Sequence, residues 1–367
     1  MSGVDITKSF FPGIASCWSF SPGTAPGENL YSRVVSSKSF SPRIASYYPD
    51  VKMVGRNDGG PLYHTYCLRQ IFGDANVEHI FPHKDTIHTH GSFDLHYWVD
   101  WGEDALGMAL DVECPRPNVY VTSDTHLGYE YRLKRAREFD WVFCNQHKAQ
   151  QDFIRDGIPA DRCFWLPHAF DPMAYSPGVF NVKTNAWMPN VATDKKYDVC
   201  FVGNLNDLNR VTHLDRLFKE FKNFRWSTAR FHEAAEIFNH SKIVFNISCR
   251  HELNMRFFEA LGSGSLLLSD NLPEGENVFI PGFHYVGYDG MDNMIEKAHT
   301  YLSPNYAEAI KENGYKEAIR NHTYLHRVKT VLDTIGFDYD KEKVGHWLSE
   351  MSLGKDVRRE ELEPSVP

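Results

Sequence analysis

Short apolar runs alternate with amphipathic stretches along the chain from about residue 61 onward. Continuous apolar runs, in which polar and apolar residues do not alternate, are typical of strands that are buried on both faces of a parallel sheet. The first series of strands is expected at 95–99, 118–122, 141–144 and 163–166, with helices at 62–72, 129–137 and 149–156. Strands that alternate with helices in this way predict a parallel sheet covered by helices on both faces.

A second series of the same kind begins at residue 197, after a stretch that is rich in proline and asparagine. Its strands are expected at 198–202, 242–247 and 266–269, its helices at 212–221, 234–239 and 254–261, and helices dominate from residue 292. Prolines at 167, 172, 177 and 189 place a domain boundary between the two series. We therefore predict an irregular segment (1–60), a first Rossmann-like domain (61–175), a linker (176–195), a second domain (196–320) and C-terminal helices (321–367).

The first 60 residues show little periodicity and contain one near repeat. The segment 8–16, KSFFPGIAS, returns at 38–46 as KSFSPRIAS. Two copies do not make a repeat architecture. We interpret them as turn units that pack on the surface.

Composition restricts the class of protein more than it identifies the function. With 367 residues, 42% apolar and 24% charged, the chain is expected to be globular and long enough for two domains. No apolar run approaches the roughly 20 residues of a membrane span, and the first residues lack the features of a signal peptide. The seven cysteines are scattered singly, which favours reduced thiols and a cytoplasmic location. The net charge of −9 argues against a general nucleic-acid binder, and the basic run 132–137 is interpreted as a solvated helix face.

The segment 242–266 has the residues expected of a phosphate-binding strand–loop–helix unit. An apolar strand leads to a polar loop, and Asn254 is a good N-cap for the helix that follows. A helix N-terminus suits a phosphate, and Arg256 on its first turn adds a bidentate donor. Glu259, three residues later, projects from nearly the same face and can accept hydrogen bonds from the two hydroxyls of a ribose. The alternative is a surface helix with an Arg–Glu pair, but the glycines at 262 and 264 favour a close backbone approach.

A second segment with this chemistry follows the strand 198–202. Gly203 and Asn204 stand at the strand end, and Arg210 comes six residues after Asn204. This turn can approach a pyrophosphate, although ordinary turn chemistry explains it equally well. The chain contains neither a GxGxxG nor a GxxxxGK[ST] motif, which disfavours dinucleotide oxidoreductases and P-loop enzymes.

Five elements occur in an order that resembles a known family. They are WLP with Ala169 and Asp171-Pro172, FVGN at 201–204, Asn246, RxFEAxxSG at 256–264, and HTYxxR at 322–327. The series is similar to the CgeB-like branch of the group 1 glycosyltransferases, over roughly residues 90–335. The resemblance implies a GT-B fold, in which two Rossmann-like domains face each other across a cleft and the C-terminal helices cross back. Val328, Val331 and Leu332 supply an apolar face for that crossing helix.

The resemblance also assigns roles to individual residues. It implies that the donor, a nucleotide sugar, binds the second domain, with the ribose on Glu259 and the diphosphate at Arg256 and the Gly203-Asn204 turn. It implies transfer without a metal ion or other cofactor. Many members of the group have two glutamates eight positions apart, whereas here the first position is His251, with Glu252 one place away. The donor-binding residues that we predict are Gly203, Asn204, Arg210, Asn246, Arg250, Asn254, Arg256 and Glu259.

The first domain supplies the candidate catalytic residues. Asp124 and His126 follow the strand 118–122, and Asp100 follows the strand 95–99. Residue types of this kind at strand ends suit a general base for an acceptor hydroxyl. Turn or cap roles for Asp124 and a structural role for His126 remain equally open. His83, His88, His90 and His96 suggest a metal site, but no acidic partner has the spacing of a known motif, and we predict none.

We therefore predict a glycosyltransferase that transfers a sugar from a nucleotide-sugar donor to an acceptor hydroxyl. The alternatives are a nucleotide-sugar epimerase or phosphorylase of similar shape, and a non-catalytic nucleotide-sugar binding module. The sequence does not distinguish between small molecules, glycans, proteins and modified nucleic acid as the acceptor.

Overall fold

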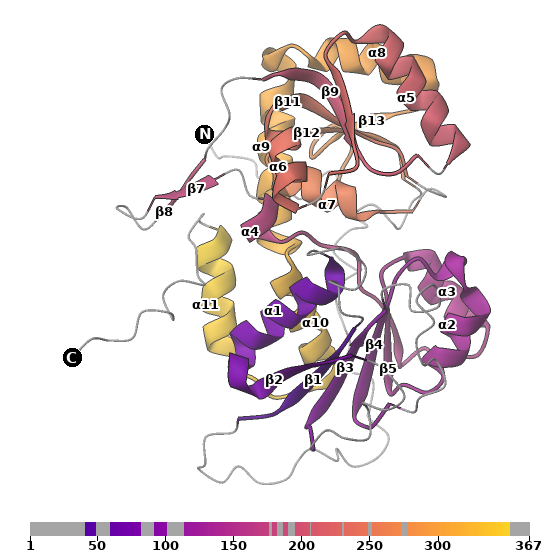
Figure 1. Ribbon diagram of the computed structural model, residues 1–367, viewed down its shortest axis with the longest axis vertical. Coiled ribbons are helices and arrows are strands. Elements are labelled where there is room, and N and C mark those ends of the chain that lie inside the picture. Colours follow the sequence, from indigo (N-terminus) through magenta and orange to yellow (C-terminus); the bar gives the residue numbers. More distant parts are fainter. Residues whose placement is uncertain are drawn as a thin grey trace, which may run out of the picture. The chain divides into compact units, whose positions relative to one another are not determined.

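The computed structural model describes residues 41–48, 59–81, 92–100, 114–175, 178–181, 186–189, 195–205, 207–229, 231–248, 252–272 and 278–352. All of them belong to the compact unit Ser41–Pro367. They form two parallel sheets, each packed against helices, together with a short hairpin (Figure 1).

The first sheet has six parallel strands in the order β2-β1-β3-β4-β5-β6. They are β1 (Ile44–Tyr47), β2 (Val77–Ile80), β3 (Leu95–Val99), β4 (Asn118–Thr122), β5 (Trp141–Cys144) and β6 (Cys163–Trp165). Every residue of β1, β3 and β4 is buried, which is why these strands have no polar face in the sequence. The helices of this domain are α1 (Gly60–Phe72), α2 (Tyr129–Ala136) and α3 (His147–Arg155), with short 3₁₀ turns at Asp74–Asn76 and Thr125–Leu127.

The second sheet has five parallel strands in the order β10-β9-β11-β12-β13. They are β9 (Tyr197–Val202), β10 (Phe224–Ser227), β11 (Ser241–Asn246), β12 (Leu266–Asp270) and β13 (Val286–Tyr288). The accompanying helices are α5 (Leu208–Glu220), α6 (Phe231–Asn239), α7 (Met255–Gly262), α8 (Gly290–Tyr301) and α9 (Pro304–Asn321).

In each sheet the second strand along the chain lies on one side of the first strand, and the third lies on the other side of the first strand. The reversal lies between β1 and β3 in the first sheet and between β9 and β11 in the second. Ligands of open α/β sheets bind in the crevice outside the carboxyl ends of the strands at such a reversal. The topology therefore marks the ends of β1 and β3, and of β9 and β11, as the places to look for sites.

The C-terminal helices return to the first domain, as the sequence predicts. α10 (Tyr324–Ile335) packs against α1, and α11 (Lys341–Ser352) packs against α9 and α10 (Figure 1). Thr323 and His326 form a capping box at the start of α10, and Gly336 ends the helix with φ 68°. Backbone hydrogen bonds join Phe170 to both His322 and Tyr324, so the end of the first domain is tied to the start of α10.

The prediction that residues 1–60 are irregular is wrong for Ile44–Tyr47. These four residues form β1, which lies between β2 and β3. The second copy of the near repeat therefore ends in a buried strand rather than a surface turn, whereas the first copy lies outside the described residues. Four buried residues after a proline-rich stretch offer no alternation that would reveal a strand. The sequence analysis also missed β2, β10 and β13, because strands of three or four residues are too short to show a pattern.

The predicted linker, 176–195, is described only in part. It contains the antiparallel pair β7 (Gly178–Asn181) and β8 (Ala186–Pro189), which follows the short helix α4 (Pro172–Tyr175). Within the described part of the chain, no helix combines the length and hydrophobicity needed to cross a membrane. Five cysteines in the same part of the chain are free thiols, and two of them, Cys144 and Cys200, are buried in β5 and β9.

Candidate functional site

Arg256 is held at the carboxyl end of the second sheet by contacts with two strands. Its Nε donates to the carbonyl oxygen of Val202 (2.6 Å), and its Nη1 donates to Oδ1 of Asn246 (2.7 Å). The guanidinium lies 4.3 Å from the centre of the Phe201 ring. Its pKa is lowered to about 10, chiefly by burial and next by the positive charge of Arg210. The first turn of α7 is thus anchored between the ends of β9 and β11, where the strand order reverses.

Gly203 makes the close packing of this arginine possible. A Cβ atom at position 203 would lie 2.2 Å from Nη2 of Arg256 and 3.1 Å from the Phe201 ring. Arg210 approaches the same turn, because its Nη1 donates to the carbonyl oxygen of Asn204 (3.0 Å). Its guanidinium also lies 5.6 Å from the centre of the Phe201 ring. Two arginines therefore converge on one turn, and each disfavours the charge of the other unless an anion lies between them.

Asn246 and Asn254 link the strand end to the start of α7. Asn246 is fully buried, and its Oδ1 accepts from Nδ2 of Asn254 (3.1 Å) as well as from Arg256. Asn254 takes the N-cap position, but its side chain makes no capping hydrogen bond, and its Oδ1 is buried without a partner in the described residues. The backbone N–H groups of the first turn thus remain uncapped by this side chain.

Glu259 lies one turn after Arg256 on α7 and is half-buried. Its carboxylate lies near Arg256, whose charge it favours, and near the Tyr324 hydroxyl, whose pKa is raised first by burial and next by this negative charge. The structure thus brings together Gly203, Asn204, Arg210, Asn246, Asn254, Arg256 and Glu259. Arg250 lies outside the described residues.

In the first domain, Asp100 is buried and extensively hydrogen-bonded. Its Oδ2 accepts from Tyr120 (3.0 Å), Thr122 (2.9 Å) and Nε of Arg132 (2.6 Å). Arg132 also forms a salt bridge with it, and both side chains are almost fully buried. The interpretation of the run 132–137 as a solvated helix face is therefore wrong for Arg132 and for Arg135, which is also buried. Asp100 lines the pocket described below, but its oxygens are occupied by these anchoring contacts. Its role as a general base remains a prediction.

Replacement of Asp100 by alanine is expected to lower the free energy of unfolding by roughly 3–5 kcal/mol, because it leaves the Arg132 charge buried without its carboxylate. Urea unfolding followed by circular dichroism measures this. The exposed Asp124, changed to asparagine, serves as the control and should leave the midpoint almost unchanged. An Asp100→Ala variant of normal stability that lacks activity would contradict the anchoring role and favour catalysis.

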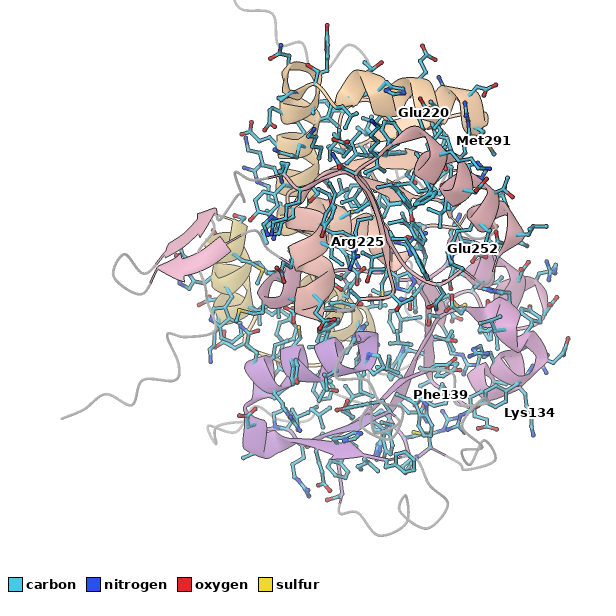
Figure 2. All side chains as sticks on the ribbon, turned by 45° about the horizontal axis from the view of Figure 1, so that its top comes forward. Lys134, Phe139, Glu220, Arg225, Glu252 and Met291 are labelled. Atoms are coloured by element: carbon cyan, nitrogen blue, oxygen red, sulfur yellow. The ribbon has the colours of Figure 1, made fainter. Side chains whose placement is uncertain are left out.

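Asp124 and His126 occupy different environments. Asp124 is exposed and has a left-handed backbone (φ 48°) at the end of β4, a conformation that aspartate tolerates better than most residues. His126 is part of the following 3₁₀ turn, and its Nδ1 lies 4.0 Å from Oε2 of Glu252. Glu252, labelled in Figure 2, belongs to the loop before α7. The sequence analysis noted Glu252 only as a displaced glutamate, whereas the structure pairs it with a candidate catalytic histidine.

A pocket opens at the carboxyl edge of the first sheet, at the ends of β3, β4, β5 and β6. It lies among the start of α1, the ends of four strands, the first turn of α7 and α10. Its lining residues are Gly60, Pro61, His64, Val99, Asp100, Ser123, Asn145, Pro167, His168, Met255, Tyr324 and Arg327. Because Met255 directly precedes Arg256, the pocket adjoins the residues around that arginine. We call them the donor-side cluster: Gly203, Asn204, Arg210, Asn246, Asn254, Arg256 and Glu259.

The HTYxxR element builds one wall of this pocket. Arg327 donates through Nε to the carbonyl oxygen of Pro167 (2.6 Å) and through Nη2 to that of His168 (2.8 Å). Nη2 also lies 2.9 Å from Nδ1 of His322, whose Nε2 lies 3.2 Å from Oε1 of Glu317. Burial lowers the pKa of Arg327 to about 10 and that of His322 to about 4.

Two pocket histidines were missed as site residues. His64 is buried, and its Nδ1 lies 2.9 Å from the Tyr97 hydroxyl. Burial lowers the pKa of His64 to about 3 and that of His168 to about 4, so both imidazoles are neutral at pH 7. His168 lies in the proline-rich stretch that we interpreted as a domain boundary, and His64 lies on a helix without a motif. No sequence signal marked either one.

The histidines considered for a metal do not form a described site. His83, His88 and His90 lie outside the described residues. His96 lies in β3, with its Nδ1 2.7 Å from the Tyr47 hydroxyl. Across the ranges that the structure describes, there is no group of three or more potential metal ligands.

Comparisons with known proteins bear on the fold and on the second domain. Residues 186–333 match the model of a family described as glycosyl transferase-like. The search of curated proteins found no match.

The solved structure of Anabaena HepE with UDP and glucose is 14% identical to the chain, with a TM-score of 0.56 over 80% of this chain and 99% of that one. A glycosyltransferase from Rickettsia africae is 8% identical, with a TM-score of 0.51 over 80% of this chain and 98% of that one. With the two parallel-sheet domains described above, these likenesses confirm the predicted GT-B fold.

Proposed function

We propose that this protein is a glycosyltransferase that transfers a sugar from a nucleotide-sugar donor to an acceptor hydroxyl. The carrying observation is the convergence of Arg256 and Arg210 on the Gly203 turn, beside the uncapped N-terminus of α7. The match of residues 186–333 to a glycosyl transferase-like family covers this cluster. The solved relative from Anabaena was crystallised with UDP and UDP-glucose, which supports a nucleotide-sugar donor here.

In the proposed reaction, an acceptor hydroxyl attacks the anomeric carbon of the donor. The bond from that carbon to the diphosphate oxygen breaks, and the acceptor proton passes to a base. The leaving diphosphate gains negative charge, which the two arginines and the N–H groups of α7 stabilise. The HTYxxR and RxFE elements favour the CgeB-like branch within this class. The five free cysteines among the described residues favour a cytoplasmic protein.

Glu259 is proposed to bind the ribose hydroxyls. Its loss is expected to weaken nucleotide-sugar binding by about 1.5–3 kcal/mol, because a charged hydrogen-bond acceptor is removed. Calorimetric titration of the donor into Glu259→Ala and the wild type measures the difference. The matched control is Glu236→Ala, which changes an exposed glutamate on α6. Equal donor affinity in Glu259→Ala and the wild type would refute this assignment.

We also propose that transfer needs no metal ion. The positive charges of Arg256 and Arg210, beside the N-terminus of α7, supply the stabilisation that a cation gives the leaving diphosphate in other enzymes. Turnover is expected to persist in EDTA. Loss of turnover on chelation, followed by recovery with Mg²⁺ or Mn²⁺, would overturn this proposal.

The non-catalytic alternative is tested by the same assays. A binding module would hold the donor without releasing nucleotide when acceptors are added. An epimerase or phosphorylase would convert the donor without any acceptor hydroxyl. Release of nucleotide that depends on the acceptor favours the transferase.

A further inference from the structure

Arg327 lies where two segments of the chain run side by side. The segment 167–171 follows β6, and the segment 321–324 joins α9 to α10. The guanidinium donates to carbonyl oxygens in both segments: those of Pro167, His168 and Asn321. The arginine thus ties the end of the first domain to the connection between α9 and α10.

A chain of hydrogen bonds leads from Arg327 to a carboxylate. The hydrogen-bond partners of Arg327 among the described residues are neutral, namely the three carbonyl oxygens and Nδ1 of His322, which lies 2.9 Å from Nη2. Because a guanidinium only donates, Nδ1 carries no proton, and the neutral imidazole has its proton on Nε2. Nε2 lies 3.2 Å from Oε1 of Glu317 and donates to it. We call Glu317, His322 and Arg327 the relay.

The protonation states of His322 and Glu317 suit this chain of hydrogen bonds. Burial lowers the pKa of His322 to about 4, despite its hydrogen bond to Glu317, so the imidazole is neutral at pH 7. The hydrogen bond from His322 is the main cause that lowers the pKa of Glu317, so this side chain is a carboxylate. The rings of Phe258 and Phe279 enclose His322, with centres 5.6 Å and 4.8 Å from its own. The imidazole is buried, so water competes little with the relay.

The relay contacts both parts of the proposed site. Arg327 and His168 line the pocket at the carboxyl edge of the first sheet. Phe258, which contacts His322, directly precedes Glu259 of the donor-side cluster on α7. A shift of the relay would therefore move the pocket wall relative to the helix that carries Glu259.

We propose that Glu317 is a positioning residue, which acts through His322 on Arg327 and so fixes the carbonyl groups that Arg327 binds. The carboxylate polarises the imidazole, which makes Nδ1 a stronger acceptor for the guanidinium. The buried cation thereby gains the support of a negative charge, which its direct partners lack. The expected effect on turnover rests on the proposed function, whereas the hydrogen-bond chain itself does not.

The first test needs no substrate and uses NMR of the full chain with ¹⁵N-labelled histidine at pH 7. His322→Asn identifies the His322 signals by their disappearance. We expect a neutral imidazole with its proton on Nε2 in the wild type and in the control Glu312→Gln, which changes an exposed glutamate of α9. In Glu317→Leu the Nδ1 and Nε2 signals should shift, because the imidazole loses the acceptor that polarises it. A proton on Nδ1, a charged imidazole, or unchanged signals in Glu317→Leu would overturn the proposal.

A double-mutant cycle tests whether Glu317 acts through His322. In His322→Asn the amide oxygen can still accept from Arg327, but the side chain is too short to reach Glu317. Glu317→Leu alone is expected to lower kcat/KM about tenfold, with nucleotide-sugar affinity by calorimetry within about twofold of the wild type. In the His322→Asn background the same change should have less than about a twofold effect. Equal losses in the two backgrounds, or normal kcat/KM in Glu317→Leu, would contradict the positioning role.

Two further measurements cover a folding defect and failure of the proposed function. Glu317→Gln keeps a neutral acceptor for Nε2, so it should fold and show a smaller NMR shift than Glu317→Leu. If the wild type transfers no sugar, the proposed function fails, and melting temperatures still test the relay. Glu317→Leu should then lower the melting temperature of the wild type but scarcely that of His322→Asn. Equal falls in both would overturn the action of Glu317 through His322.

Discussion

Replacement of Arg256 by alanine is expected to lower kcat/KM for the nucleotide sugar by about 100-fold or more. Val202 and Asn246 hold the side chain in place. Under the proposed function it stabilises the leaving diphosphate, and removal of one preorganised donor of this kind costs roughly 10²–10³ in rate. Steady-state kinetics with circular dichroism as a check on folding measure the effect. Arg256→Lys should recover only part of the loss, because an ammonium lacks the planar fork of a guanidinium.

The control for this variant is Arg225→Ala, which removes an exposed arginine of β10 that is labelled in Figure 2. Its kinetics should match those of the wild type. A folded Arg256→Ala enzyme with near-normal kcat/KM would contradict the role of this arginine.

Truncation after Ile319 is expected to unfold the first domain. The deletion removes α10, whose Leu325, Val328, Val331 and Leu332 are buried in the core that includes α1 and the first sheet. Each buried aliphatic side chain contributes about 1.5–3 kcal/mol, so four of them approach the roughly 5–15 kcal/mol that stabilises a domain. Circular dichroism and solution scattering should show lost structure and a larger radius.

The alternative is that α10 only caps the second domain. In that case the truncated chain would keep its size, its cooperative unfolding and much of its donor binding. Truncation after Ser352 is the matched control, because it keeps α11 whole, and it should behave like the full chain.

The sequence predicted the two-sheet plan because buried parallel strands leave continuous apolar runs between amphipathic helices. Seven strands were recognised in this way, with ends within one residue: β3, β4, β5, β6, β9, β11 and β12. β1 was missed, because four residues after a proline-rich stretch carry too little pattern, although the strand lies near the middle of its sheet. Strand order and the points of reversal depend on long-range pairing, which local pattern does not contain.

The donor-side cluster was predictable because its residues lie close together in the sequence or at strand ends. Arg256, Asn254 and Glu259 share one helix start, and Gly203 ends a strand. The pocket at the carboxyl edge of the first sheet was not predictable, since His64, His168 and Tyr324 come from segments that are distant in the sequence and meet only through the return of α10. The engagement of Asp100 by Arg132 was equally invisible, because the two residues are separated by an entire strand and helix start.

The most direct test of a nucleotide-sugar donor on the second domain is the melting temperature of the full chain with UDP-, GDP-, ADP- and CDP-sugars. A ligand that binds only the folded state raises the melting temperature in proportion to the logarithm of its concentration over Kd. We expect one base to give a clear rise in the wild type and in Arg225→Ala, and a much smaller rise in Arg256→Ala and Glu259→Ala. No rise with any of the four, or an equal rise in all variants, would contradict the proposed donor site.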